Sequence, residues 1–164
     1  MTPKRIEPQP GQESVWDYPR PPRLEATNKH IQIMFNGVLI ADTRNAKRVL
    51  ETSHPPSYYI PPEDVQMQFL QRGNGSSLCE WKGAAGYYTL KVGDKTLENV
   101  AWFYAHPTPA FEAIHNHLAF YPHDMDACWV DGERALPQPG RFYGGWITHD
   151  VVGPFKGEPE TMGW

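Results

Sequence analysis

The residues of this chain with the strongest chemical potential lie together around one glycine. Cys79, Trp81 and Lys82 precede Gly83, so a thiol, an indole and an ammonium fall within four residues of a turn that leads into a predicted strand. A cysteine becomes a nucleophile when a base or a cation lowers its pKa, and a lysine can hold an anion or polarise a carbonyl. Because folding alone rarely requires this combination, we interpret the segment as a candidate site.

Each of these residues also has a purely structural interpretation. Free cysteine is among the most frequently buried side chains, and no histidine lies near Cys79 in the sequence. Lys82 either binds a ligand or extends its charged end to solvent along an apolar surface. Tyr88 is a third candidate for catalysis, in proton transfer. The sequence leaves these alternatives open, so the catalytic residues of any reaction are unknown, with Cys79, Lys82 and Tyr88 as candidates.

Aromatic residues that follow the turn provide candidate walls for a pocket. The predicted ligand-binding residues are Trp81, Lys82, Gly83, Tyr88, Trp102, Tyr104 and Tyr121. In strand-rich proteins, aromatic rings with a few polar groups often line a cavity, but they also build ordinary cores. If these side chains contact a ligand, replacing Lys82 or Trp102 by alanine should leave the thermal stability nearly unchanged.

Other polar clusters give weaker evidence of a site. Asp124 and Asp126 would present two carboxylates on one side of an extended segment, which suits a divalent cation, but a solvated loop explains them as well. His115 and His117 would diverge by about 200° on the helix expected there, so they would not share one ion. The chain contains no Cys-x-x-Cys and neither of the glycine-rich loops that bind nucleotide phosphates. We therefore predict no metal and no cofactor.

Composition restricts the functional class further. The 164 residues carry a net charge of −4, which argues against a nucleic-acid-binding surface because such a surface needs clustered lysine and arginine. No apolar segment approaches the ~20 residues of a membrane span, and we expect no signal peptide. The chain has two cysteines, Cys79 and Cys128. We expect a cytoplasmic protein with two free thiols and with neither nucleic-acid nor membrane partners.

The elements that would position these residues are mainly short strands. Alternating apolar residues flank Asn36-Gly37, Gly93-Asp94 and Asp131-Gly132, which predicts hairpins over residues 31–42, 87–104 and 127–136. We expect another strand over residues 146–152. Two short helices are predicted, one opened by Pro61-Pro62 and one beginning at Pro109. The second should place Phe111, Ile114, His115 and Leu118 on one face. The fold class is therefore mainly β with two short helices and a complex antiparallel sheet arrangement.

We expect a single domain with two appendages. Residues 1–28 hold six prolines and resemble an extended arm, which Trp16 and Tyr18 would dock on the body or on a neighbouring subunit. Residues 29–136 would form the β domain, and residues 137–164 a glycine- and proline-rich extension packed on it. Strand edges and arms favour homodimerisation, so a second copy of the chain is one expected partner.

Several segments resemble one known family in order, from about Ile31 to Glu133. They are Tyr58-Tyr59-Ile60-Pro61, Cys79-Glu80-Trp81-Lys82-Gly83-Ala84-Ala85, Val100-Ala101-Trp102-Phe103-Tyr104 and Ala119-Phe120-Tyr121. These segments are similar to those of DUF427, a bacterial family of unknown function. Members usually carry proline after the cysteine, where this chain has Glu80. A carboxylate beside the thiol would oppose thiolate formation and weaken a nucleophilic role for Cys79.

The resemblance implies a compact tent-like fold of the Mss4-like kind, in which two antiparallel sheets meet at an angle. Relatives of that architecture bind zinc through paired cysteine motifs, which this chain lacks, so the resemblance carries no zinc here. The family also has a nucleotidyltransferase-like name, which no motif of this chain supports.

Three functions follow from these observations. The leading hypothesis is a small-molecule-binding β domain with a pocket near Cys79–Gly83. The second is an enzyme in which Lys82 stabilises developing negative charge or activates a carbonyl, with Cys79 or Tyr88 in proton transfer. The third is a protein-interaction module built on the N-terminal arm and the C-terminal extension. The ligand or substrate is not identified by the sequence.

Overall fold

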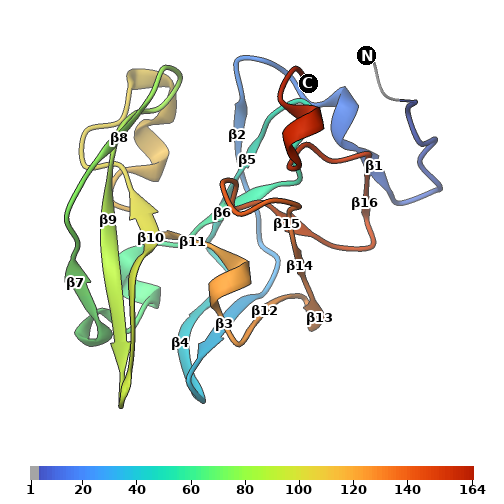
Figure 1. Ribbon diagram of the computed structural model, residues 1–164. Coiled ribbons are helices and arrows are strands. Elements are labelled where there is room, and N and C mark those ends of the chain that lie inside the picture. The colour runs from blue at the N-terminus through green and yellow to red at the C-terminus, as the bar shows by residue number, and fades with distance from the viewer. Residues whose placement is uncertain (1–3) are drawn as a thin grey trace.

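The computed structural model describes residues 4–164 and is mainly β (Figure 1). Its strands are β1 (Glu13–Ser14), β2 (Arg23–Ala26), β3 (Ile31–Phe35), β4 (Val38–Thr43), β5 (Lys47–Leu50), β6 (Ser57–Tyr59), β7 (Leu70–Arg72), β8 (Ser77–Cys79), β9 (Gly83–Val92), β10 (Lys95–Phe103), β11 (Ala119–Phe120), β12 (Ala127–Val130), β13 (Glu133–Arg134), β14 (Leu136–Pro137), β15 (Trp146–Ile147) and β16 (Val151–Val152). Its helical segments are 3-10 turns: η1 (Val15–Asp17), η2 (Pro62–Asp64), η3 (Met67–Phe69), η4 (Pro109–Ile114), η5 (Pro122–Asp124) and η6 (Pro159–Thr161). The predicted fold class is confirmed.

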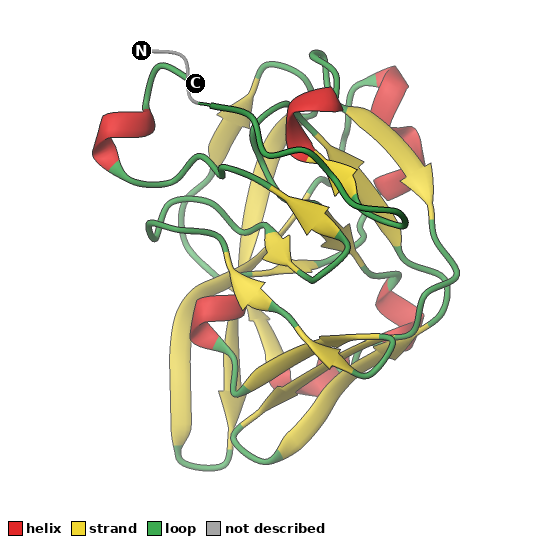
Figure 2. Cartoon of the chain, turned by 90° about the vertical axis from the view of Figure 1, so that its right-hand side faces the viewer, coloured by secondary structure: helices red, strands yellow, loops and turns green. Residues whose placement is uncertain are grey.

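Two antiparallel sheets enclose the main hydrophobic core. One has the strand order β11-β10-β9-β7, with β8 paired to β9, and the other has the order β13-β12-β3-β4. Buried residues of both sheets, such as Ile33, Phe35, Leu90 and Phe120, pack together in that core. Figure 2 shows the helical turns at the ends and edges of the strands, where they form no layer of their own. The strands therefore determine where the side chains of any site can lie.

The three predicted hairpins are present. Asn36 and Gly37, and likewise Asp131 and Gly132, all have positive φ, as a type I′ turn requires at both of its central residues. The third hairpin is shorter than predicted because β13 ends at Arg134 and the chain then leaves β12. The next strand, β14, pairs with β15 of the C-terminal extension. The predicted strand over residues 146–152 is likewise divided into β15 and β16.

Both predicted helices are present as 3-10 turns. η2 begins at Pro62 as expected, and η4 begins at Pro109 but ends at Ile114. The chain leaves the helical path at His115, whose φ is −49° and ψ 122°, and Asn116 follows with a φ of 57°. The predicted shared face is correct for Phe111 and Ile114, which are buried, and wrong for His115, which is exposed. Among residues 4–164, no helix is long and apolar enough to span a membrane.

The N-terminal arm and the C-terminal extension pack on each other and on the body. β1 pairs in parallel with β16, and β2 joins the sheet β2-β5-β6. Val15 and Tyr18 of the arm are buried with Leu50 and Val151. The indole Nε1 of Trp16 donates a hydrogen bond of 2.8 Å to the carbonyl of Pro154. The extension is thereby held in place on one side of the domain, where it faces the end of the β9–β10 sheet.

Candidate functional site

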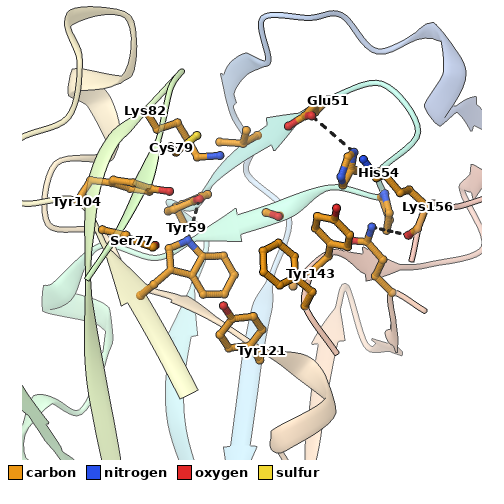
Figure 3. Close-up of a pocket in the computed structure, with 18 of the residues that line it drawn as sticks. Glu51, His54, Tyr59, Ser77, Cys79, Lys82, Tyr104, Tyr121, Tyr143 and Lys156 are labelled. Atoms are coloured by element: carbon orange, nitrogen blue, oxygen red, sulfur yellow. Dashed lines mark hydrogen bonds and ion pairs between the residues drawn. The ribbon is translucent and has the colours of Figure 1, made fainter. Parts of the chain in front are cut away.

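A cavity of about 490 Å³ opens between the sheet that contains β8, β9 and β10 and the C-terminal extension (Figure 3). We call one side the sheet wall. Its residues are Tyr59, Ser77, Cys79, Lys82, Tyr87, Trp102, Tyr104 and Tyr121. We call the opposite side the loop wall. Its residues are Glu51 and His54 from the loop after β5, and Gln138, Arg141, Phe142, Tyr143, Gly144 and Lys156 from the extension.

Strand alternation selects the rings of the sheet wall. Successive side chains of a strand point to opposite faces, so Trp102 and Tyr104 lie on the same side of the sheet. Tyr87 is the register partner of Trp102 and joins them at the cavity. Tyr88 points to the other face, where its ring lies 4.7 Å from that of Phe103, between ring centroids. One position along β9 therefore separates a cavity residue from a residue that packs against the main core.

Trp102 connects the sheet wall internally. Its side chain is 9% exposed, and its Nε1 donates a hydrogen bond of 3.0 Å to the hydroxyl of Tyr59. The ring of Tyr121 lies 4.6 Å away, between centroids. Burial is the main cause that raises the pKa of Tyr121 to about 12, and it also raises the pKa of Tyr104. Both phenols are therefore neutral hydrogen-bond donors across the physiological pH range.

The turn that carries Lys82 is fixed against the segment before η4. Gly83 has a φ of 113°, and a Cβ there would lie 3.1 Å from the carbonyl oxygen of His106. The amide of Thr108 donates to the carbonyl of Lys82 at 2.9 Å, and its hydroxyl donates to the carbonyl of Trp81 at 2.6 Å. These contacts hold the backbone of the turn, so that Lys82 extends into the cavity beside Cys79 (Figure 3).

Lys82 is a protonated cation in a partly enclosed environment. Burial lowers the pKa of its ammonium, but Tyr59, Cys79 and Glu51 together raise that pKa by more, so it lies above the ordinary value. The ammonium lies 5.9 Å from the centroid of the Tyr104 ring. Among residues 4–164, no carboxylate comes within the 4.0 Å of an ion pair with it. Lys82 therefore carries a positive charge that Cys79, Tyr59 and Glu51 stabilise without a direct ion pair among residues 4–164.

His54 is the main titratable group of the loop wall. Its Nδ1 donates a hydrogen bond of 2.9 Å to the carbonyl of Thr52, which fixes the tautomer and leaves the lone pair on Nε2. Burial lowers the pKa of His54, although the nearby carboxylate of Glu51 opposes this shift. The ring packs edge-on against Tyr143, with 4.9 Å between centroids. His54 is therefore neutral near pH 7 and has a basic nitrogen.

Backbone hydrogen bonds join the two parts of the loop wall. The amide of Lys156 donates to the carbonyl of Ser53, and the amide of Trp146 donates to that of Pro56, both at 2.8 Å. The side chain of Gln138 donates to the carbonyl of Lys156 at 2.7 Å and accepts from the amide of Gly145 at 3.1 Å. The extension is therefore a fixed part of the cavity.

The structure brings five of the predicted site residues together at the cavity. They are Cys79, Lys82, Trp102, Tyr104 and Tyr121. Trp81, Gly83 and Tyr88 do not line it. Trp81 packs against a second hydrophobic core, which is formed by Val49, Tyr59, Ala85, Trp102, Tyr104, Phe111, Ile114 and Ala119. Gly83 shapes the turn, and Tyr88 faces the other side of the sheet. Whether any of the eight candidates contacts a ligand stays a prediction.

Sequence reasoning missed several residues that line the cavity. They are Glu51, His54, Tyr59, Tyr87, Tyr143 and Lys156. Two of them had a detectable signal, because Tyr87 lies opposite Trp102 in the predicted hairpin and Tyr59 lies in a segment already noted for its resemblance. The signal at His54 was weak, since a histidine before two prolines is typical of an ordinary loop.

The two aspartates considered for a metal ion have other partners. Asp124 lies 3.3 Å from His123 Nε2 and 3.5 Å from an Arg141 nitrogen. Asp126 accepts a hydrogen bond from the amide of Gly37 at 2.9 Å. In the described range 4–164, no group of three or more His, Cys, Asp or Glu side chains is arranged to hold a metal ion.

A comparison with protein families shows which family the chain resembles. The model of a family described as a domain of unknown function, DUF427, matches residues 23–131. No curated protein matches the chain. The matched range includes all of the sheet wall, and it includes Glu51 and His54 of the loop wall. The remaining loop-wall residues, from Gln138 to Lys156, lie outside it.

Proposed function

The chain belongs to the DUF427 family, and from that premise we propose that it binds a small molecule in the cavity between the sheet wall and the loop wall. One observation carries the proposal: the ammonium of Lys82 lies in a partly enclosed, aromatic-lined cavity, and no carboxylate of residues 4–164 lies at ion-pair distance from it. Lysines withdrawn from water are normally paired, because the loss of hydration of a charge is costly. A ligand group that accepts hydrogen bonds would supply the missing partner.

The dimensions and the lining of the cavity agree with this proposal. A volume of about 490 Å³ lies within the ~300–1,000 Å³ that is usual for small-molecule sites. Aromatic rings with a few convergent polar groups are the usual lining of such sites. Here the polar groups are Lys82, the tyrosine hydroxyls and His54. We further propose a cytoplasmic location, since both cysteines are free thiols.

Alkylation of Cys79 tests whether molecules occupy the cavity. Cys79 lines the cavity, whereas Cys128 is 2% exposed in the main core, where burial also raises the pKa of its thiol. Iodoacetamide should therefore label Cys79 first, with Cys128 as the internal control. A fragment that occupies the cavity should slow labelling of Cys79 and leave Cys128 unchanged. Failure of a broad set of anionic, neutral and cationic fragments to slow labelling would count against the proposal.

His54 supports an enzyme as a second candidate function. Its Nε2 is a base on the loop wall, and the Lys82 ammonium lies on the sheet wall across the cavity (Figure 3). A base and a cation on opposite sides of a bound molecule suit proton abstraction next to a carbonyl. Nε2 would take the proton, the C–H electron pair would become an enolate, and Lys82 would stabilise the charge on the oxygen.

Deuterium exchange tests this second function without a known product. Phenylpyruvate and related keto acids would be incubated with the protein in D₂O, and loss of the C–H signal next to the carbonyl would be followed by NMR. The enzyme hypothesis predicts exchange faster than in buffer and loss of that excess in His54→Gln. An exchange rate equal to that of buffer alone for every keto acid contradicts it.

A further inference from the structure

The charged groups of the cavity favour an anionic ligand. Lys82, Lys156 and Arg141 line the cavity, whereas Glu51 is the one carboxylate among the lining residues described. Glu51 is itself paired, since its Oε2 lies 3.3 Å from the Nε of Arg20. The whole chain carries a net charge of −4. The positive excess is therefore a local property of the cavity.

Lys82 differs from the other two cations in its partners. The Nζ of Lys156 donates to the carbonyl of Trp164 at 3.4 Å, and a guanidinium nitrogen of Arg141 lies 3.5 Å from the carboxylate of Asp124. Within residues 4–164, neither Lys82 nor Lys156 has a carboxylate at ion-pair distance, but Lys82 interacts with Tyr59, Cys79 and Glu51 and is the cation of the sheet wall. A half-buried ammonium without an ion pair is stabilised by an anion that enters the cavity.

The donors around Lys82 suit a carboxylate better than a phosphate. Phosphate sites usually combine several backbone amides, a helix N-terminus or an arginine fork. Here the donor set on the sheet wall is one ammonium with phenolic hydroxyls, beside a strand and a turn. The hydroxyl of Tyr59 accepts the N–H of Trp102, so its own proton is directed to another acceptor. On the sheet wall, one point charge with neutral hydroxyl donors matches a single negative charge, while Arg141 and Lys156 lie on the opposite wall.

The rest of the cavity suits a planar, apolar body. Trp102 and Tyr121 lie in contact on the sheet wall, and Tyr143 packs against His54 on the loop wall. Figure 3 shows the Tyr143 ring across the cavity from Tyr104 and Lys82. Aromatic ligands gain from such surroundings, because ring pairs contribute ~0.5–1.5 kcal/mol beyond the area that they bury.

We infer that the ligand of this cavity is an aromatic carboxylate, with its carboxylate at Lys82 and its ring between the sheet wall and the loop wall. This inference rests on the proposed function and goes beyond it by naming the ligand class. The positive charge of Lys82 favours the carboxylate of the ligand, and the aromatic rings on both walls favour its planar ring. Tyr143 lies outside the range that the family shares, so the loop wall determines which aromatic body is accepted.

Five probes of similar size test the inference. Phenylacetate is compared with benzyl alcohol, benzylamine, cyclohexylacetate and phenyl phosphate, by protection of Cys79 from iodoacetamide and by calorimetric titration. Phenylacetate should bind at least about tenfold more tightly than benzyl alcohol, as expected for a charge-assisted hydrogen bond. It should also bind more tightly than cyclohexylacetate and phenyl phosphate.

Two lysine variants make the test specific to the site. Lys82→Met should reduce phenylacetate affinity at least about tenfold and leave benzyl alcohol affinity nearly unchanged. Lys95→Met is the matched control, because the Lys95 ammonium also lies over an aromatic ring, 4.8 Å from the centroid of Phe35, but Lys95 does not line the cavity. It should bind phenylacetate as the wild type does. If Lys82→Met does not fold, the comparison of the five probes on the wild type still decides the matter.

The outcomes separate the inference from the proposed function. If benzyl alcohol or benzylamine protects Cys79 as well as phenylacetate does, the cavity binds small molecules but the aromatic carboxylate is the wrong class. Tighter binding of phenyl phosphate overturns the carboxylate in favour of a phosphate, and tighter binding of cyclohexylacetate overturns the aromatic body. If no probe protects Cys79, the proposed function itself loses its support together with the inference.

Discussion

The two walls of the cavity are built in different ways. The sheet wall presents side chains from paired strands, where the register of β9 and β10 places Tyr87 opposite Trp102. The loop wall consists of the loop after β5 and a C-terminal extension with only short strands, held by backbone hydrogen bonds such as that from Lys156 to Ser53. The family match covers the sheet wall and stops before the extension. We therefore expect the sheet wall to carry the chemistry and the loop wall to select among ligands.

The two walls come into close contact at Gly144. A Cβ on Gly144 of the extension would lie 2.4 Å from a ring carbon of Trp102 and 3.3 Å from one of Tyr121. Glycine at this position lets the backbone of the loop wall approach the rings of the sheet wall. Substitutions at Trp102 and at Gly144 therefore test how much each wall depends on this contact.

The largest effect on stability is expected for Trp102→Ala, which removes the sheet-wall side chain that Gly144 of the loop wall contacts. Loss of a buried tryptophan typically costs ~3–5 kcal/mol of the free energy of unfolding, and here the hydroxyl of Tyr59 also loses its donor. Urea denaturation of the wild type and the variant measures the change. Trp129→Ala, at a half-buried position of β12, is the control and should cost less. A loss below about 1 kcal/mol would mean that Trp102 serves a ligand more than the fold.

This prediction reverses the expectation that the sequence supported for Trp102. From the sequence, an aromatic side chain near a suspected pocket was expected to leave stability nearly unchanged when it was removed. Its 9% exposure and its hydrogen bond to Tyr59 now assign it a structural role as well. Lys82, whose ammonium has no carboxylate partner among the described residues, keeps the original expectation.

The parts of the fold that were predictable are those that local sequence determines. Asn36-Gly37 and Asp131-Gly132 adopt positive φ with little steric cost, so the hairpins around them could be identified from a few residues. The turn at Lys82 was identified for the same reason, since its unusual residues are adjacent in the chain. In contrast, Leu136 pairs with Ile147, a contact between strands that no local pattern specifies.

The choice between Tyr87 and Tyr88 shows where sequence reasoning about the site fails. Both faces of β9 are covered, one by the second core with Tyr87 and the other by the main core with Tyr88. Alternation of polar and apolar residues then carries no information about which face holds the cavity. Tyr143 and Lys156 were unpredictable for a different reason, because only the docking of the extension brings them to the site.

A smaller effect is expected for Gly144→Ala, which changes the contact from the loop-wall side. The added methyl group would collide with Trp102, and overpacking of this kind costs ~1–3 kcal/mol. The extension should also become more sensitive to trypsin at Arg141. Gly163→Ala is the matched control, because a Cβ there would meet nothing within 4 Å. If both variants unfold and are cleaved as the wild type is, the two walls do not depend on this contact.

The smallest effect is expected from pH and concerns His54 of the loop wall. Burial holds its pKa below the ordinary 6.5, with Glu51 opposing this shift and Lys156 and Arg20 reinforcing it. The unfolded chain therefore takes up the proton at a higher pH than the folded protein does. The stability that neutral His54 contributes is complete above about pH 6.5 and declines as the pH falls towards the folded-state pKa.

Melting temperatures at pH 7.5 and pH 5.5 measure this contribution. The wild type should lose more stability between the two pH values than His54→Gln does, by less than the change caused by Gly144→Ala. His117 and His123, whose pKa values burial also lowers, and His149, whose pKa Glu133 raises, are present in both proteins, so the difference between them isolates His54. An equal pH dependence in the two proteins would mean that His54 is not kept neutral by the fold. The fold would then not keep His54 in the neutral form, and the proposal of proton abstraction would lose the base that it assigns to His54.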